Sequence, residues 1–463
     1  MKKALAALFL SSLPATSWAA AADDRLVAAV RGNDIAAIKS ELAAGASANT
    51  QLADKSSVLE WAIDRQNEDA VKLLLAAGAN ANAPDPTGIA PLALACEFGN
   101  PTIVTSLLAA GADVKVPRPE GVTVLALCAG SSTPAVLEAL IAKGANVNQA
   151  DPQGQTPLMW AAMYGKPDNI ALLIKKGADV NAVEKSGFTP LFFALRGENP
   201  DAPMRLLEAG ANVKAVIPRG ASVLEAAVTV GNIPFAMQAV RSGVNVKHRD
   251  NQGRTAIHIA AATGNAEFVK LVLSKGGNPN AMTVVAPPPA PVPASVKVAA
   301  ASTASKPAAG AQPAPDMPER PKPYPVPATP LQFAAKAGSV EAMKALVDAG
   351  AKPDVKGPDG MTLALAAASG GHLEAMKYAY ELDPHLDAIA RGGRGPLHLL
   401  VANKQAAEPE AVITFLADKG AKLDLADERK STAGDDVNRF GAENVRVFFI
   451  QLLRDRGIVS VAH

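Results

Sequence analysis

Aromatic side chains and cysteines are scarce in this sequence. Only 4% of the 463 residues are Phe, Trp or Tyr, and there are two cysteines. Such a low aromatic content is unusual for an enzyme core built of strands, but it is normal where small side chains let helices pack closely. The sequence therefore favours a helical protein.

Neither sign of charge is in excess. The 45 Lys and Arg residues against 44 Asp and Glu residues leave a net charge of +1. Binding to nucleic acid or to anionic lipid depends on an excess of positive charge. We therefore expect no nucleic-acid partner, and the near-neutral balance favours protein partners.

Motifs that carry catalysis are absent as well. The sequence contains no H-E-x-x-H, no G-x-S-x-G, no phosphate-binding glycine loop before Lys-Ser/Thr and no EF-hand loop. His248, His385 and His463 have no carboxylate or cysteine partner at the spacing of metal ligands. We expect no enzymatic activity, no cofactor and no bound metal.

The one pronounced apolar run lies at the N-terminus and is too short to span a membrane. Ala4–Leu13 follows Lys2 and Lys3 and precedes Ser17-Trp18-Ala19, which resembles an A-x-A cleavage site. This pattern predicts a signal peptide over residues 1–19, the alternative being a helix of the mature protein. We expect a soluble exported protein, periplasmic if the source is a Gram-negative bacterium, with secretion as the alternative.

Glycine and proline, in contrast, recur at a fixed interval. A glycine that would close a helix returns every 33 residues, and a second series of turn glycines from Gly88 to Gly253 keeps the same step. The first series is Gly45, Gly78, Gly111, Gly144, Gly177, Gly210, Gly243 and Gly276, and prolines at Pro101, Pro134, Pro167 and Pro200 fall at the expected start of a second helix. The chain is therefore a repeat protein.

Residues 151–183 show one repeat clearly. Thr156 is expected to cap a first helix that starts at Pro157, and Gly165 to end it in a left-handed conformation. A second helix starts at Pro167, carries an apolar stripe and stops at Gly177. Two short antiparallel helices and a turn cannot bury their own apolar face, so each repeat must stack on its neighbours.

The motifs in these repeats identify a family resemblance. Asp151-x-x-Gly154-x-Thr156-Pro157-Leu158, Ala161-Ala162 and Gly177-Ala178-Asp179-Val180-Asn181 occur in one repeat, and Thr255-Ala256-Ile257-His258 occurs in another. The chain resembles the ankyrin-repeat family over nearly all of its length after residue 19. The resemblance implies an all-α solenoid of paired antiparallel helices with β-hairpin turns, and it implies a structural role for His258 and His398.

The repeat register also divides the chain. Residues 23–282 are expected to form ankyrin repeats with an N-terminal cap, and residues 328–463 further repeats with a C-terminal cap helix from about Ala442 to Arg456. Between them, 283–327 is a Pro/Ala-rich insertion of about 41 residues beyond the register, expected to be disordered and to replace one hairpin turn. We predict that the two blocks stack as one solenoid. Two tethered solenoids are the alternative.

Cys96 and Cys128 occupy alanine positions of the first helix in adjacent repeats. An oxidised pair would join the repeats, but it requires Cα atoms within about 7 Å. We expect neighbouring first helices to be somewhat too far apart and favour two buried thiols, with a disulfide as the other interpretation. The C-x-x-C arrangement of redox enzymes is absent.

Family members bind partners on the concave face, which in this register holds the residue after the turn glycine and the two residues before the inter-helix glycine. The candidate partner-binding residues are Ile89, Glu97, Phe98, Gln155, Met163, Tyr164, Phe188, Arg196 and Arg254. Aromatic residues, Met and Arg are favoured at the centres of interfaces. We expect a monomeric, non-catalytic scaffold, inhibitor or stabilising partner of an envelope protein, and the alternative is a secreted effector that binds a host protein.

Overall fold

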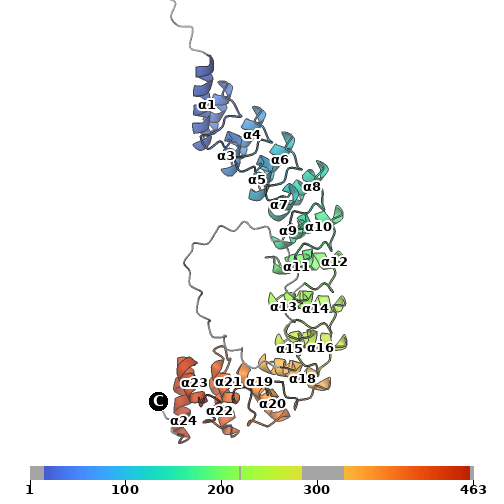
Figure 1. Cartoon of the computed structure of the whole chain (residues 1–463), viewed down its shortest axis with the longest axis vertical. Helices are drawn as coiled ribbons and strands as arrows, with labels where there is room; N and C mark the ends of the chain where they lie inside the picture. The colour runs from blue at the N-terminus through green and yellow to red at the C-terminus, as the bar shows by residue number, and fades with distance from the viewer. Residues whose placement is uncertain (1–14, 218–219, 284–327, 459–463) are drawn as a thin grey trace, which may run out of the picture. The chain divides into compact units, whose positions relative to one another are not determined.

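The computed structural model describes residues 15–217, 220–283 and 328–458 (Figure 1). Within these ranges the chain forms 24 helices and no strand, and none of the helices is long and apolar enough to cross a membrane. The predicted signal peptide lies outside the described residues except for residues 15–19, which belong to the first helix. The predicted insertion lies outside them except for Thr283.

Each repeat contributes two helices. The first helices are α1 (Ala15–Arg31), α3 (Val58–Asp64), α5 (Pro91–Phe98), α7 (Val124–Ser131), α9 (Pro157–Met163), α11 (Pro190–Arg196), α13 (Val223–Thr229), α15 (Ala256–Ala262), α17 (Pro330–Lys336), α19 (Leu363–Gly370), α21 (Pro396–Ala402) and α23 (Ala433–Phe440). The second helices are α2 (Ile35–Ala43), α4 (Glu68–Ala76), α6 (Pro101–Ala109), α8 (Pro134–Ala142), α10 (Pro167–Lys175), α12 (Ala202–Glu208), α14 (Ile233–Arg241), α16 (Ala266–Ser274), α18 (Val340–Asp348), α20 (Leu373–Leu382), α22 (Pro409–Asp418) and α24 (Glu443–Asp455). The expected all-α repeat solenoid is confirmed.

The chain divides into two compact units, Met1–Pro218 with Thr229–Ala239, and Arg219–Val228 with Val240–His463. In the first unit α3 packs on α5, α5 on α7, α7 on α9 and α9 on α11, while α4 to α12 form a second row beside them (Figure 1). In the second unit α15 to α23 and α16 to α24 pack in the same two rows. The apolar side chains between the rows are fully buried and form the core.

Local sequence sets the ends of these helices. The Thr156 hydroxyl accepts a hydrogen bond from the Met159 amide at the start of α9, as a capping residue does. At the end of α10, Gly177 has φ of +91°, a conformation that costs glycine little. The predicted start of a second helix at Pro200 is wrong, because α12 begins at Ala202. The Asn199 side-chain oxygen Oδ1 accepts from the Asp201 amide and forms a turn there instead.

A carboxylate organises five of the turns that precede the first helices. In one of them, the Asp151 carboxylate accepts hydrogen bonds from the Gln153 and Gln155 amides, both at 2.9 Å. The Asp151 amide in turn donates to the Gln155 carbonyl at 3.0 Å. Asp85, Glu184, Asp250 and Asp427 hold their turns in the same way. The side chain that ends each of these five turns, such as Gln155, is thereby fixed in direction.

Asparagines of the G-A-x-x-N motif join successive repeats. The Asn148 amide nitrogen donates to the Gly177 carbonyl, and its oxygen accepts from the Asp179 amide, both at 2.9 Å. Asn49, Asn82, Asn181 and Asn280 make the same pair of bonds. Lys115 and Lys247 occupy this position in other repeats, and a lysine side chain has no acceptor atom for the second bond.

The repeats on the two sides of 284–327 pack on each other within the second unit. Helix α15 contacts α17, and α16 contacts α18. The Thr283 amide donates to the Ala328 carbonyl at 2.9 Å, the bond that Glu184 and Phe188 make across an ordinary turn. In the sequence, 284–327 occupies the register of Lys185–Gly187 in the earlier repeat. That the insertion replaces one hairpin turn stays a prediction, with which this hydrogen bond is consistent.

The two cysteines form a disulfide between α5 and α7. Their Cα atoms are 4.6 Å apart, and both residues are fully buried. The expectation that neighbouring first helices are too far apart for this bond was therefore wrong. Fully buried alanines at Ala95 and Ala129 lie beside the cysteines, and side chains this small let the helices approach closely.

Candidate functional site

The predicted binding residues of the first unit lie at the ends of the first helices and in the turns before them. We call this surface the first-helix face, and it consists of Ile89, Glu97, Phe98, Gln155, Met163, Tyr164, Phe188 and Arg196. Large apolar side chains on it remain accessible: Phe98 and Tyr164 are each 46% exposed. Exposed aromatic residues at repeated positions give this face the composition of an interface.

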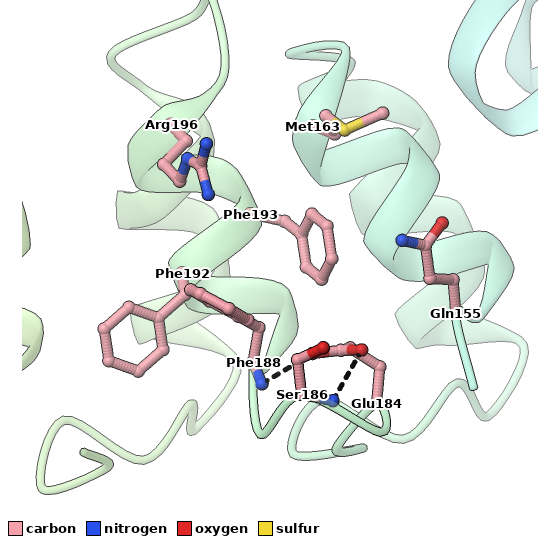
Figure 2. Close-up of a pocket in the computed structure, with 8 residues that line it drawn as sticks. All are labelled: Gln155, Met163, Glu184, Ser186, Phe188, Phe192, Phe193 and Arg196. Atoms are coloured by element: carbon pink, nitrogen blue, oxygen red, sulfur yellow. Dashed lines mark hydrogen bonds between the residues drawn. The ribbon is translucent and has the colours of Figure 1, made fainter. Parts of the chain in front are cut away.

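Four residues of the first-helix face line one pocket. Gln155, Met163, Phe188 and Arg196 surround a cavity of about 350 Å³ together with Glu184, Ser186, Phe192 and Phe193. Figure 2 shows Gln155 and Met163 on the α9 side and Arg196 on the α11 side, with the Phe193 ring pointing into the space between them. We refer to these eight residues as the Phe193 pocket. It lies between repeats 151–183 and 184–216.

The turn before α11 fixes the wall of the pocket. The Glu184 side chain is buried, and its two oxygens accept from the Ser186 amide at 2.9 Å and the Phe188 amide at 3.0 Å (Figure 2). The Phe188 ring then packs edge-on against Phe192, with ring centroids 6.0 Å apart, and lies 6.2 Å from Phe193. Three phenylalanines from one turn and one helix make this wall apolar and rigid.

Phe192 and Phe193 are pocket residues that sequence reasoning missed. Phe192 occupies the position of His258 in the T-P-L-H motif, where the buried histidine bonds to the backbone. A phenylalanine there cannot make those bonds, and Phe192, only 2% exposed, lines the pocket instead. The sequence signal was Phe192, an aromatic residue at the position that holds His258 in another repeat.

The two charged side chains at the pocket, Glu184 and Arg196, differ in how far their charge is available to a ligand. The buried Glu184 carboxylate is occupied by two backbone amides, as described above. Arg196 is exposed, lies with its guanidinium 6.0 Å from the centroid of the Phe188 ring, and has no carboxylate oxygen of a described residue within 4.0 Å. The mouth of the pocket therefore presents a positive charge beside an aromatic ring.

Tyr164 directly follows the pocket residue Met163 and is the C-cap residue of α9. Its ring stacks on Trp160 with a centroid distance of 5.9 Å and covers Gly130, where an added Cβ would come within 2.6 Å of the ring. Only a glycine at position 130 leaves room for the ring in this place. Tyr164 therefore presents one face to solvent while its other face is supported, which holds it in a defined orientation.

The other predicted residues lie away from the pocket. Glu97 accepts from Arg118 at 2.6 Å, and Ile89 is half-buried in its turn. In the second unit, Arg254 donates to Asp250 at 2.7 Å and to Glu225 at 3.2 Å. Burial, reinforced by the Asp250 carboxylate, raises the pKa of Glu225 above its usual range. These pairs give Glu97 and Arg254 a structural role, and their role in binding stays a prediction.

The described residues contain no group of three or more His, Cys, Asp or Glu side chains arranged to hold a metal ion. His258 and His398 are buried and bonded to backbone atoms of their own and the following repeats. The chemistry that the first-helix face offers is therefore that of contact: apolar rings, a thioether, an amide and a guanidinium.

A family model described as "Ankyrin repeats (3 copies)" matches residues 26–118, 94–184, 124–217, 186–283 and 329–427, which together cover more than half of the chain. The protein belongs to the ankyrin-repeat family. No curated protein matches this chain. Ankyrin repeats generally mediate protein–protein interaction and are generally non-catalytic binding scaffolds. The pocket between repeats 151–183 and 184–216 thus lies in a fold whose general use is the binding of proteins.

Proposed function

We propose that this protein is a non-catalytic binding protein that holds another protein on the first-helix face of its first unit. The observation that carries the proposal is the Phe193 pocket, because four residues selected from the repeat register line one cavity of about 350 Å³. Half-exposed Phe98 and Tyr164 extend the same face over the preceding repeats. Aromatic anchors beside a pocket are typical of the residues that dominate interface energies.

We further propose that the partner is a protein of the cell envelope and that the protein acts on it, as a monomer, as a scaffold, inhibitor or stabilising partner. The leader pattern of residues 1–19 supports export. Fractionation tests the compartment: periplasmic retention fits this proposal, whereas accumulation in the culture medium would favour a secreted protein that binds a host partner. Sedimentation velocity tests the monomer.

Affinity capture with quantitative mass spectrometry tests the binding face. The full-length protein is compared with a Phe98→Ala/Tyr164→Ala double variant and with Phe188→Ala, using a periplasmic extract. We expect each variant to lose a protein that the wild type enriches. Val447→Ala is the matched control, because Val447 is 57% exposed but lies on α24 in the second unit. If no captured protein depends on the first-helix face, the proposal is wrong.

A further inference from the structure

The Phe193 pocket has the size of a site for one large side chain and its neighbour. Its volume of about 350 Å³ is at the small end of the range found for ligand pockets, about 300–1,000 Å³. Phe188, Phe192 and Phe193 form one wall, and Met163 from α9 lies opposite. Aromatic rings pack well edge-on against other rings, and a thioether adapts to their edges. The apolar part of the pocket fits an aromatic side chain.

The polar groups at the pocket favour a partner with a negative charge. Glu184 is buried and its two oxygens are engaged by the Ser186 and Phe188 amides, so the carboxylate is directed into its own turn. Arg196, in contrast, is exposed at the mouth and pairs with no carboxylate of the described residues. A guanidinium placed over an apolar pocket matches a carboxylate carried close to the inserted ring.

The same turn argues against a chain terminus as the source of that carboxylate. Terminal carboxylates are commonly captured by free backbone amides arranged as a nest. Here the Ser186 and Phe188 amides are already bonded to Glu184. The donors left for a ligand are the side chains of Arg196, Gln155 and Ser186, which suit an Asp or Glu side chain in a passing segment.

We propose that the Phe193 pocket binds an internal segment of the partner in which an aromatic side chain stands next to an acidic residue. The ring fills the space between Met163 and Phe193, and the acidic side chain pairs with Arg196. This inference rests on the proposed function of the first-helix face and adds to it the chemistry of the partner.

Saturation-transfer NMR titrations of the full-length protein with short peptides test this proposal. The probes are acetyl-Gly-Ser-Phe-Glu-Ser-Gly-amide, the same peptide with Gln in place of Glu, and acetyl-Gly-Ser-Phe with a free terminal carboxylate. We expect the Glu peptide to bind about three- to fivefold more tightly than the Gln peptide, as partly exposed ion pairs allow. The preference should shrink in 0.5 M salt because the pair is accessible to ions.

Variants assign the effect to the pocket. Arg196→Gln should make the Glu and Gln peptides bind equally, and Phe193→Ala should weaken both. If Phe193→Ala lowers the melting temperature, Met163→Gln on the opposite wall replaces it. Arg205→Gln is the matched control, since Arg205 lies in the same repeat, on α12, paired with Glu208. It should change neither affinity.

Three outcomes would overturn the inference: equal binding of the Glu and Gln peptides, tighter binding of the peptide that ends in Phe, or peptide binding that is indifferent to both wall variants. Each is separable from a failure of the proposed function. If a partner is captured in a Phe188-dependent manner but the peptides give one of these outcomes, the binding face stands and only the preference for an acidic-aromatic segment is refuted. Loss of both results would refute the two together.

Discussion

The His258 imidazole hydrogen-bonds to the carbonyl of Ala328, a residue 70 positions later, at 3.2 Å, and to the carbonyl of Ala281 at 3.0 Å. Its other nitrogen accepts from the Thr255 amide at 3.1 Å. Since that amide is only a donor, Nδ1 is the acceptor and Nε2 carries the proton. One neutral side chain thus bonds to the backbone on both sides of the insertion.

This arrangement predicts a pH-dependent stability. Burial lowers the pKa of His258 from 6.5 to about 4. Between these values the unfolded chain binds a proton that the folded protein does not, so stability falls as the pH drops from about 6.5 to about 4, by about 3 kcal/mol in total. Urea unfolding at pH 7.5, 6, 5 and 4, followed by circular dichroism, measures the loss.

His258→Gln isolates this contribution from the titration of the carboxylates. Gln332 occupies the same position in the next repeat, where its oxygen accepts from the Ala328 amide and its nitrogen donates to the Met361 carbonyl. Glutamine is therefore compatible with the fold, and the variant should lose less stability than the wild type over the same pH range. If the free energy of unfolding fell equally with pH in both proteins, the pH dependence would not come from His258.

Removal of the insertion should leave the solenoid intact. Residues 284–327 can be replaced by Asn-Gln-Gly, the residues that stand between Asp250 and Arg254 in the preceding turn. The Thr283–Ala328 hydrogen bond already has the geometry of such a turn. Closing the three-residue connection costs about 2 kcal/mol less in chain entropy than closing the longer insertion. Thermal unfolding should show an equal or higher melting temperature. A marked loss of stability would mean that the insertion contributes to the fold.

Cleavage of the insertion provides an independent test of stacking across it. A specific protease site placed within 284–327 allows the chain to be cut without change to the repeats. Because α15 packs on α17 and α16 on α18, the two fragments should stay together on a sizing column in the absence of denaturant. Fragments that separate would show that the blocks are only tethered.

The Cys96–Cys128 disulfide should stabilise the first unit. It closes a loop with a sequence separation of 32, for which chain entropy predicts about 3–4 kcal/mol. The Cys96→Ala/Cys128→Ala double variant, with the residue that neighbouring repeats use, should unfold at correspondingly lower urea concentration. Thiol titration of the denatured, unreduced wild type should find no free thiol. Two free thiols would restore the interpretation of buried, unpaired cysteines.

The asparagine contacts predict opposite effects at equivalent positions. Asn148→Ala removes the bonds to Gly177 and Asp179 and should cost about 1–2 kcal/mol. Lys115→Asn should gain about 0.5–1 kcal/mol by forming the same bonds to the following repeat. Lys247→Asn repeats the test in the second unit. If neither lysine variant changed the free energy of unfolding, the asparagine hydrogen bonds would not be what stabilises the contact between successive repeats.

Periodicity predicted the fold because each helix boundary depends on local chemistry. Thr156 caps α9 and Gly177 follows α10 as expected, since caps and left-handed glycines need only near neighbours. Pro200 failed as a helix start because Asn199 forms a local turn that competes with it. The disulfide was misjudged because the distance between helices depends on packing, which the spacing of cysteines along the chain does not report.

The candidate site could be predicted only in part. The repeat register placed Gln155, Met163, Phe188 and Arg196 on one face, and the structure gathers them around one cavity. Phe192 and Phe193 were overlooked because apolar residues inside a helix are ordinarily assigned to the core. The ion pairs of Arg254 were missed because Glu225 lies 29 residues away and meets it only after the repeats stack.

The backbone hydrogen bond between Thr283 and Ala328 makes this turn a suitable place to insert a foreign sequence. Its two ends meet as they do in a short turn, and His258 hydrogen-bonds to the backbone on both sides. The packing of the two adjacent repeats therefore does not depend on the segment that connects them. Peptide epitopes or whole small domains with adjacent termini could be grafted here. The protein thus contains a position for display that is independent of the proposed binding face.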